Sequence, residues 1–261
     1  MTKKHLGQNF LFDPSILKRI ISVAHLSSED TVVEIGPGLG RLTALLSEHA
    51  ARVVAIELDE DLYRRLTGTL SGHENVEVVL GDALRYPYET LGEFKVVANI
   101  PYYITTPVIF KLIEYKAQLE SMTLMVQREV AQRIVATPGN KDYGVLSIMV
   151  QYHGKPRLEF IVPRGAFRPA PKVDSAVLHI ELYKEPLVQV KNEKFFFRVI
   201  RTAFSQRRKM LLNSLKSIST DTKEKLISAG IEPTRRPETL SIGEFARLAD
   251  ELSGEVDGSK P

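Results

Sequence analysis

The chain contains no cysteine among its 261 residues. That absence excludes disulfide bonds, Cys-ligated zinc, iron–sulfur clusters and Cys nucleophiles. Long apolar runs are also missing: uninterrupted apolar stretches are only a few residues long, far short of the roughly 20 residues that cross a bilayer. The charged segment Met1–Asn9 has no apolar core after it, so we expect no signal peptide. The resulting expectation is a cytoplasmic protein without a membrane segment.

The rest of the composition is that of an ordinary globular protein, with 43% hydrophobic and 26% charged residues. Collagen-like, low-complexity and intrinsically disordered chains are therefore excluded. The length suits one large domain, alone or with a small addition. The six histidines are scattered without the spacing of metal ligands, so we expect no metal site.

Positive charge gathers toward the end of the chain. Residues 1–183 carry 20 Lys and Arg against 21 Asp and Glu, whereas residues 184–261 carry 15 against 11. Between Lys194 and Thr220 there are seven basic residues and no acid. Charge of one sign on a helix is typical either of a solvated face or of a surface that binds a polyphosphate such as RNA.

Short Val- and Ile-rich runs alternate with helical patterns between about residues 31 and 183. This alternation predicts βαβ units and a mainly parallel sheet. The last two runs have no long helix between them, so they should form an antiparallel, hairpin-like end. The expected strands are Thr31–Ile35, Arg52–Ile56, Val76–Leu80, Lys95–Ala98, Met122–Val126, Leu158–Val162 and Ser175–Leu182. The expected helices between them begin near Arg41, Asp59, Thr106, Gln127 and Tyr143.

A helix is also expected before the first strand, and only helices are expected after about residue 190. Asp13-Pro14 is a favourable helix start, because Asp can cap the helix and Pro fits its first turn. The segment Met1–Leu11 precedes the fold proper, where it can cover a pocket. The predicted parts are an α/β, doubly wound domain over 1–183, an all-helical domain over 184–252 and a flexible tail over 253–261.

The first expected strand runs into a glycine-rich turn, Gly36–Gly40, that a helix follows. Glycines permit a tight turn and let a ligand approach the main chain. The second strand ends in Glu57, about 20 residues after Gly36, where doubly wound sheets place the acid that binds ribose hydroxyls. The third strand ends in Gly81-Asp82, whose carboxylate can accept a hydrogen bond from an adenine amino group. This order predicts a site for an adenosine-containing cofactor at the carboxyl ends of the strands.

The glycine turn differs from the common phosphate-binding motifs. Its spacing is Gly-x-Gly-x-Gly rather than the dinucleotide pattern Gly-x-Gly-x-x-Gly, and no P-loop lysine follows it. The chain also contains no Tyr-x-x-x-Lys pair of the short-chain dehydrogenase type. These absences argue against an NAD-dependent oxidoreductase. S-adenosylmethionine has no phosphates, so it fits this glycine turn better than a dinucleotide does.

The fourth expected strand ends in Asn99-Ile100-Pro101-Tyr102. The Asn99 side-chain oxygen and the main-chain carbonyl that follows can both accept hydrogen bonds from one NH₂ group, and Tyr102 offers a flat face for a base. The amino group of adenine is a poor nucleophile because its lone pair is delocalised into the ring. Two acceptors draw that nitrogen toward tetrahedral geometry and localise the pair. Methyl transfer from a sulfonium then depends on positioning and electrostatics rather than on a strong base.

Six segments, in this order along nearly the whole chain, resemble the rRNA adenine N6-dimethyltransferase family, and its small-subunit rRNA branch most closely. Six matching segments in sequence are far more specific than any one of them. They are Gly7–Leu11, Val33–Gly40, Asn99–Tyr102, Tyr143–Ser147, Ala166–Ser175 and Ala203–Lys209.

The resemblance implies roles for individual residues. Asn99 and the Ile100 carbonyl would hold the target amino group, and Tyr102 and Phe167 would sandwich the adenine. The residues implied to contact S-adenosylmethionine are Asn9, Leu11, Gly36, Glu57, Asp82 and Asn99. The basic residues implied to contact RNA in the helical domain are Arg201, Arg207, Arg208 and Lys209.

The resemblance also implies an activity, which is the N6-dimethylation of two adjacent adenines in the 3′-terminal hairpin loop of small-subunit rRNA. A role in small-subunit maturation is implied as well, with a monomer acting on an assembly intermediate. Two alternatives stay open. One is a large-subunit rRNA adenine methyltransferase that confers macrolide-type resistance, and the other is a non-catalytic ribosome-assembly factor on the same fold.

Overall fold

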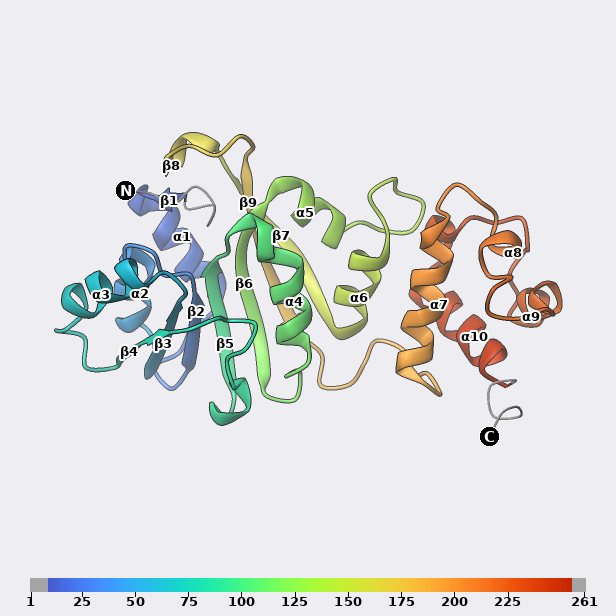
Figure 1. Cartoon of the computed structure of the whole chain (residues 1–261), viewed down its shortest axis with the longest axis horizontal. Helices are drawn as coiled ribbons and strands as arrows, with labels where there is room; N and C mark the ends of the chain where they lie inside the picture. The colour runs from blue at the N-terminus through green and yellow to red at the C-terminus, as the bar shows by residue number, and fades with distance from the viewer. Residues whose placement is uncertain (1–8, 255–261) are drawn as a thin grey trace. The chain divides into compact units, whose positions relative to one another are not determined.

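The computed structural model describes residues 9–254 and divides the chain into two compact units (Figure 1). The first unit comprises the chain up to Ala131 together with Lys155–Lys184, and the second comprises Gln132–Gly154 and the chain from Glu185 on. Predictions for residues 1–8 and for the tail from residue 255 lie outside the described residues. Each helix within residues 9–254 is too short or too polar to cross a membrane.

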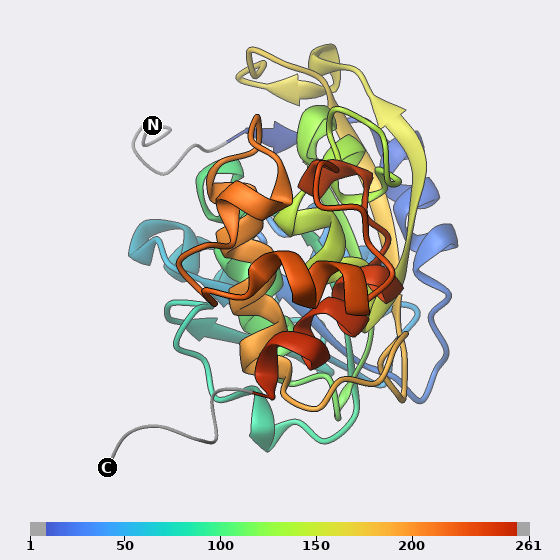
Figure 2. The same ribbon diagram turned by 90° about the vertical axis from the view of Figure 1, so that its right-hand side faces the viewer.

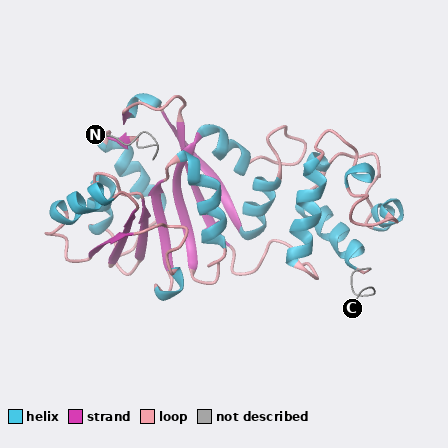
Figure 3. Cartoon of the chain, viewed as in Figure 1, coloured by secondary structure: helices cyan, strands magenta, loops and turns pink. Residues whose placement is uncertain are grey.

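A seven-stranded sheet forms the centre of the first unit, with the strand order β4-β3-β2-β5-β6-β9-β7 (Figure 3). The first five of these strands in that order pair in parallel, and β9 pairs antiparallel to β6. This topology confirms the predicted Rossmann-like, doubly wound α/β fold. The strands are β2 (Thr31–Ile35), β3 (Arg52–Glu57), β4 (Val76–Leu80), β5 (Phe94–Asn99), β6 (Leu119–Gln127), β7 (Gly154–Val162) and β9 (Ser175–Leu182).

The central strands are buried on both faces. Val32 and Val53 pack into the cluster that contains the apolar side chains of the first two helices, and their neighbours Val33 and Val54 point to the opposite face. All four side chains are fully buried, which explains why these strands are continuous apolar runs rather than alternating patterns. The helices of this region are α1 (Pro14–Ala24), α2 (Arg41–Ser47), α3 (Glu60–Thr69), α4 (Thr105–Ile113) and α5 (Arg128–Ile134).

Two predicted details at the ends of this unit are confirmed. The Asp13 carboxylate accepts a hydrogen bond from the Ser15 N–H and so caps α1. The last two strands, β7 and β9, are neighbours in the sheet, which confirms their pairing, and its antiparallel direction stays a prediction. Between them lies β8 (Phe167–Arg168), which pairs antiparallel with β1 (Phe10–Leu11) in a small second sheet.

The second unit is helical and is built around α7, which can be followed in Figure 2 with the other orange and red helices. The sequence predicts that the helical domain begins at residue 184. In the structure, the second unit also contains residues 132–154. The reason is aromatic packing: the ring of Tyr152 in the added segment lies 5.1 Å from the ring of Phe196 on α7. The helices are α6 (Val145–His153), α7 (Glu193–Ser205), α8 (Leu211–Ser214), α9 (Thr222–Ser228) and α10 (Ile242–Ser253).

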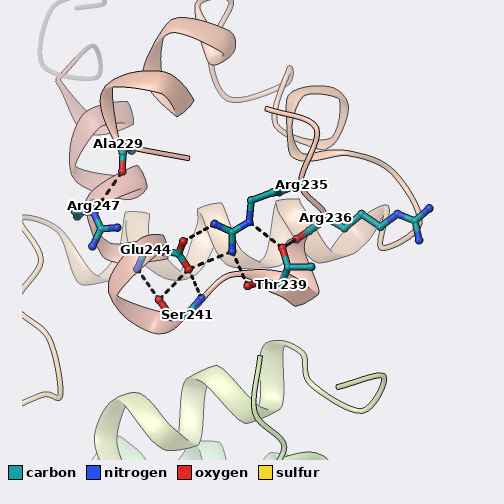
Figure 4. Close-up of polar contacts among 7 residues, drawn as sticks. All are labelled: Ala229, Arg235, Arg236, Thr239, Ser241, Glu244 and Arg247. Carbon is teal, nitrogen blue, oxygen red and sulfur yellow. Dashed lines mark hydrogen bonds and ion pairs between the residues drawn. The ribbon is translucent and has the colours of Figure 1, made fainter. Parts of the chain in front are cut away.

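Arg235 ties the bend before α10 to the start of that helix (Figure 4). Its guanidinium pairs with the Glu244 carboxylate and donates to the Thr239 carbonyl at 2.7 Å. Burial alone would raise the pKa of Glu244, but hydrogen bonds from Arg235 and Ser241 outweigh it and lower that pKa to about 2. The adjacent Arg236 is exposed, and its side chain extends away from the network. Arg235 therefore has a structural role.

Candidate functional site

A pocket opens at the carboxyl ends of β2, β3, β4 and β5, where the strand order reverses between β2 and β5. Ligands of open α/β sheets bind at such a reversal point. The pocket brings together all six residues that the sequence analysis assigned to the cofactor, which are Asn9, Leu11, Gly36, Glu57, Asp82 and Asn99. It is also lined by Ile100 and Tyr102 of the tetrapeptide. The cofactor turn and the tetrapeptide therefore share one cavity.

The glycine turn after β2 has the backbone that its sequence predicts. Gly36, Gly38 and Gly40 all have positive φ angles, of 67°, 60° and 75°, which L-residues with side chains rarely adopt. A Cβ atom on Gly38 would also lie 2.9 Å from the Phe10 ring. Glycine at this position is thus required by the main-chain conformation and by the close approach of β1.

Glu57, at the end of β3, is fixed by two main-chain donors. Its carboxylate accepts from the Gly38 N–H at 3.2 Å and from the Asp59 N–H at 2.9 Å. Burial raises the pKa of Glu57, and the two hydrogen bonds counter that effect. The carboxylate therefore connects the glycine turn to the second strand and stands at the place predicted for a ribose contact.

Asp82 lies beyond the end of β4 and is more accessible than Glu57. Its Oδ1 accepts a hydrogen bond from the Leu84 N–H at 2.9 Å, and its side chain is 41% exposed. The hydrogen bond orients the carboxylate within the loop, and the exposure leaves it open to a ligand in the pocket.

Glu34, on β2, is a buried acid in the pocket wall that the sequence analysis did not single out. Burial raises the pKa of its carboxyl to about 8, and the nearby Glu57 charge adds to the effect. Its Oε2 is buried without a hydrogen-bond partner in the described structure, an arrangement that needs an explanation in a native protein. Only its place inside the Val33–Gly40 segment could have indicated it.

The acids give the pocket its charge. Glu34, Glu57 and Asp82 line it together with a single basic residue, Arg41, among the described residues. Glu34 keeps its proton below about pH 8, so the carboxylates of Glu57 and Asp82 supply the negative charge, which suits a ligand that carries positive charge and does not suit a pyrophosphate. The donor and acceptor set thus fits S-adenosylmethionine, which carries a sulfonium and an ammonium group.

Asn99 ends β5 with its amide oriented by the N-terminal segment. Its Nδ2 donates to the Asn9 carbonyl oxygen at 3.3 Å, so its Oδ1 is the atom that can accept from a substrate amino group. The Ile100 N–H donates to the Met125 carbonyl at 3.2 Å and holds the following peptide against β6. One acceptor is therefore oriented by the hydrogen bond of its own side-chain amide, and the other belongs to a backbone segment held against β6.

Tyr102 begins the short 3₁₀ helix η3 (Tyr102–Ile104) and is fixed by β9. Its hydroxyl is hydrogen-bonded to the Ser175 Oγ at 2.6 Å. Burial raises the pKa of the Tyr102 phenol, although the Ser175 hydrogen bond opposes the rise, so the ring is neutral at physiological pH. A neutral ring held at its far end is suited to stacking on a base.

Phe167 does not line this pocket beside Tyr102. Its side chain is fully buried and belongs to the core cluster that also contains Leu11 and Leu17. The reason is the pairing of β1 with β8, in which Leu11 and Phe167 are direct partners. The resemblance implied that Phe167 forms the second face of a base sandwich with Tyr102, whereas the structure places its ring in the core cluster rather than in the pocket wall.

The basic residues predicted to contact RNA lie on the surface of the second unit. Arg201 is exposed on α7, and Arg207, Arg208 and Lys209 are exposed in the turn that follows it. The Arg207 guanidinium donates to the Lys141 carbonyl oxygen, which anchors that turn. The exposure of all four residues leaves their charges accessible to a partner.

Comparison with known proteins gives one consistent result. The family described as "Ribosomal RNA adenine dimethylase" matches residues 1–253. The protein named Ribosomal RNA small subunit methyltransferase A from Moorella thermoacetica is 47% identical to this chain over an alignment of 265 residues, gaps included. The alignment covers 96% of this chain and 92% of the relative.

Two solved structures are similar over most of their length. A dimethyladenosine transferase from Plasmodium falciparum has a TM-score of 0.79 and 29% identity, covering 92% of this chain and 95% of the other. The 23S rRNA methyltransferase ErmE has a TM-score of 0.74 and 29% identity, covering 94% of this chain and 100% of the other.

Proposed function

This chain belongs to the ribosomal RNA adenine dimethylase family and is an S-adenosylmethionine-dependent rRNA adenine dimethyltransferase, and we propose that its substrate is the small ribosomal subunit. The proposed targets are two adjacent adenines in the 3′-terminal hairpin loop of small-subunit rRNA, each dimethylated at N6 during subunit maturation in the cytoplasm. The relative from Moorella thermoacetica, which carries a small-subunit name, supports this choice of subunit.

The observation that carries the proposal is the continuity of the pocket. A single cavity is lined by the glycine turn, by Glu57 and Asp82, and by the tetrapeptide Asn99–Tyr102. A methyl donor and an acceptor amine held in one cavity can react in line, and such positioning contributes a large part of the rate enhancement in a two-substrate reaction.

The proposed cofactor contacts divide between the two ends of the pocket. Glu57 accepts from the ribose hydroxyls, and Asp82 accepts from the adenine amino group. Asn9, Leu11 and Gly36 enclose the remainder beside Asn99. When bound, S-adenosylmethionine supplies an electrophilic methyl group on a sulfonium. Asn99 and Ile100 present the nucleophile, the adenine N6, to that methyl group.

The proposed catalytic contribution of the chain is to position and polarise the adenine N6. The Asn99 Oδ1 and the Ile100 carbonyl oxygen each accept one N–H of the amino group. This arrangement localises the nitrogen lone pair and directs it toward the methyl group. The nitrogen becomes cationic as the new N–C bond forms, and only then does its proton leave, so no strong base is needed before attack.

Tyr102 is the proposed stacking partner of the target base. A base reaches this ring only after it leaves its own stack, which is why a hairpin loop is a suitable substrate. Phe167, the second stacking residue that the resemblance implies, is fully buried in the core cluster with Leu11 and does not line the pocket. We therefore assign the stacking to Tyr102 in the described arrangement.

The second unit is the proposed RNA-binding part of a monomeric enzyme. Its exposed basic residues Arg201, Arg207, Arg208 and Lys209 are suited to contact phosphates, which fix the position of a nucleic acid without reading its sequence. The boundary predicted from the sequence, 184–252, and the second unit of the structure, which also contains residues 132–154, both place these four residues in one part.

The direct test is methyl transfer from labelled S-adenosylmethionine to purified small and large subunits from a strain that lacks the modification. The proposal expects label in the small-subunit RNA alone. Label in the large subunit would instead place the chain with enzymes such as ErmE. Cofactor binding without label in either subunit would support an assembly role on the same fold.

A further inference from the structure

Two adjacent tyrosines, Tyr102 and Tyr103, follow β5, and both line the pocket. The Tyr102 hydroxyl bonds to Ser175 on β9, which lies two strands from β5 on the β6 side of the sheet. Tyr103 also lines the pocket, but the charged groups that act on its phenol are Asp82 and Glu57. Those two acids follow β4 and end β3, on the other side of β5.

Tyr103 is unusually exposed for an aromatic residue in a pocket wall. It is 54% exposed, and Leu58, which follows Glu57 in the same wall, is 53% exposed. Single exposed apolar side chains are common, but two that border one cavity indicate a surface that a ligand covers. The part of the ligand beside them is the part that Glu57 and Asp82 hold.

The phenol of Tyr103 has no hydrogen bond that would direct it to the substrate side of the pocket among the described contacts. Burial raises its pKa, and the negative charges of Asp82 and Glu57 raise it further, so the group is a neutral phenol near two carboxylates. A neutral ring in this wall of the pocket can pack its face on a purine.

We infer that Tyr103 is the aromatic cover of the adenosine half of the cofactor site, packing on the adenine ring opposite Leu58. This inference rests on the proposed function for the identity of the cofactor. The two tyrosines then divide the work: Tyr102 receives the base that is methylated, and Tyr103 holds the base of the methyl donor. Tyr103 is a binding residue and takes no part in the transfer itself.

The test measures binding of S-adenosylhomocysteine and of adenosine to the intact chain by calorimetry, without RNA. Removing a stacked aromatic ring weakens binding by roughly tenfold or more, so Tyr103→Ala should raise the Kd of both ligands by about that factor. Tyr103→Phe should bind like the original protein, because the ring face carries the contact. Tyr183→Ala removes a partly buried tyrosine that does not line the pocket and should leave both Kd values unchanged.

A kinetic comparison separates the two tyrosines. Tyr103→Ala should raise the KM for S-adenosylmethionine and leave the KM for small subunits unchanged, whereas Tyr102→Ala should do the reverse and lower kcat. An unchanged Kd in Tyr103→Ala, or a change confined to the KM for subunits, would overturn the inference and leave the proposed function intact. Failure of the original protein to bind S-adenosylhomocysteine would instead overturn the proposed function.

Discussion

The Nδ2 of Asn99 donates a hydrogen bond to the Asn9 carbonyl oxygen at 3.3 Å, so a residue before the first helix orients the side chain that ends β5. The same N-terminal segment continues into β1, whose Phe10 ring lies against the Gly38 turn. The proposed acceptor of the target amine and the proposed cofactor turn thus share one support, which joins the two halves of the proposed reaction.

Replacing Asn99 by Ala should abolish most of the transfer while leaving the fold intact. The change removes one of two acceptors for the N6 amino group, and loss of one such contact lowers kcat by about 10²- to 10³-fold in comparable sites. Single-turnover methylation of small subunits would measure the loss. Thermal unfolding serves as the control, with an unchanged midpoint expected, and near-normal turnover in this variant would contradict the mechanism.

Gly38→Ala should damage both stability and cofactor binding. The added methyl group meets the Phe10 ring and the residue must keep a positive φ, which costs about 1–2 kcal/mol for the backbone alone. Gly68→Ala on α3 is the matched control, because nothing lies within 4 Å of its Cβ and alanine favours a helix by up to about 1 kcal/mol. Denaturant unfolding should therefore show a lower free energy of unfolding for Gly38→Ala and a higher one for Gly68→Ala. Equal changes in the two variants would contradict the account of the turn.

Glu34 should make the first unit less stable as the pH rises. Its folded pKa of about 8 lies above the ordinary value of 4.5, so the folded protein holds a proton that the unfolded chain releases between these values. The contribution of the protonated Glu34 to the free energy of unfolding is fully present below about pH 4.5 and is lost as the pH rises toward 8. Glu34→Gln cannot ionise and should remove this part of the slope, with a gain on the order of a few kcal/mol at pH 8.

Thermal unfolding of both proteins at pH 5 and pH 8, without cofactor, would measure this difference. Glu57 also has a raised pKa and remains in both proteins, so only the difference between them reports on Glu34. Parallel pH profiles for the two proteins would show that Glu34 is ionised in the folded state.

Neutralising Arg207, Arg208 and Lys209 together by Gln should weaken binding to small subunits and flatten its salt dependence. Each phosphate contact releases about one counterion, so the slope of log K against log salt should fall by up to about three. The control replaces Lys18, Arg65 and Lys155, three exposed basic residues of the first unit, and removes the same charge. Filter binding at several salt concentrations would distinguish the sets, and identical slopes for the two variants would reject a specific RNA-binding surface.

The sequence predicts the strands well because their signal is local. Thr31–Ile35, Val76–Leu80 and Ser175–Leu182 agree with the observed bounds residue for residue, since continuous apolar runs between helices leave few alternatives. The order of glycine turn, Glu57 and Asp82 also predicts one pocket, because the carboxyl ends of parallel strands meet at one edge of a sheet.

Long-range packing explains what the sequence does not predict. The addition of residues 132–154 to the helical unit depends on Tyr152 meeting Phe196, two residues far apart along the chain. The burial of Phe167 depends on the pairing of β1 with β8. Strands of two residues are too short to give a recognisable sequence pattern. The hydrogen bond between Tyr102 and Ser175 and the exposure of Tyr103 in the pocket wall likewise depend on tertiary structure.

The most direct test of the central claim is mass spectrometry of the 3′-terminal fragment of small-subunit RNA after reaction with this protein and S-adenosylmethionine. The account predicts a gain of four methyl groups, divided equally between two adjacent adenines, and a gain that is slower by about 10²- to 10³-fold with Asn99→Ala. Methyl groups at another site, or an unmodified fragment with the original protein while large-subunit RNA gains mass, would contradict it.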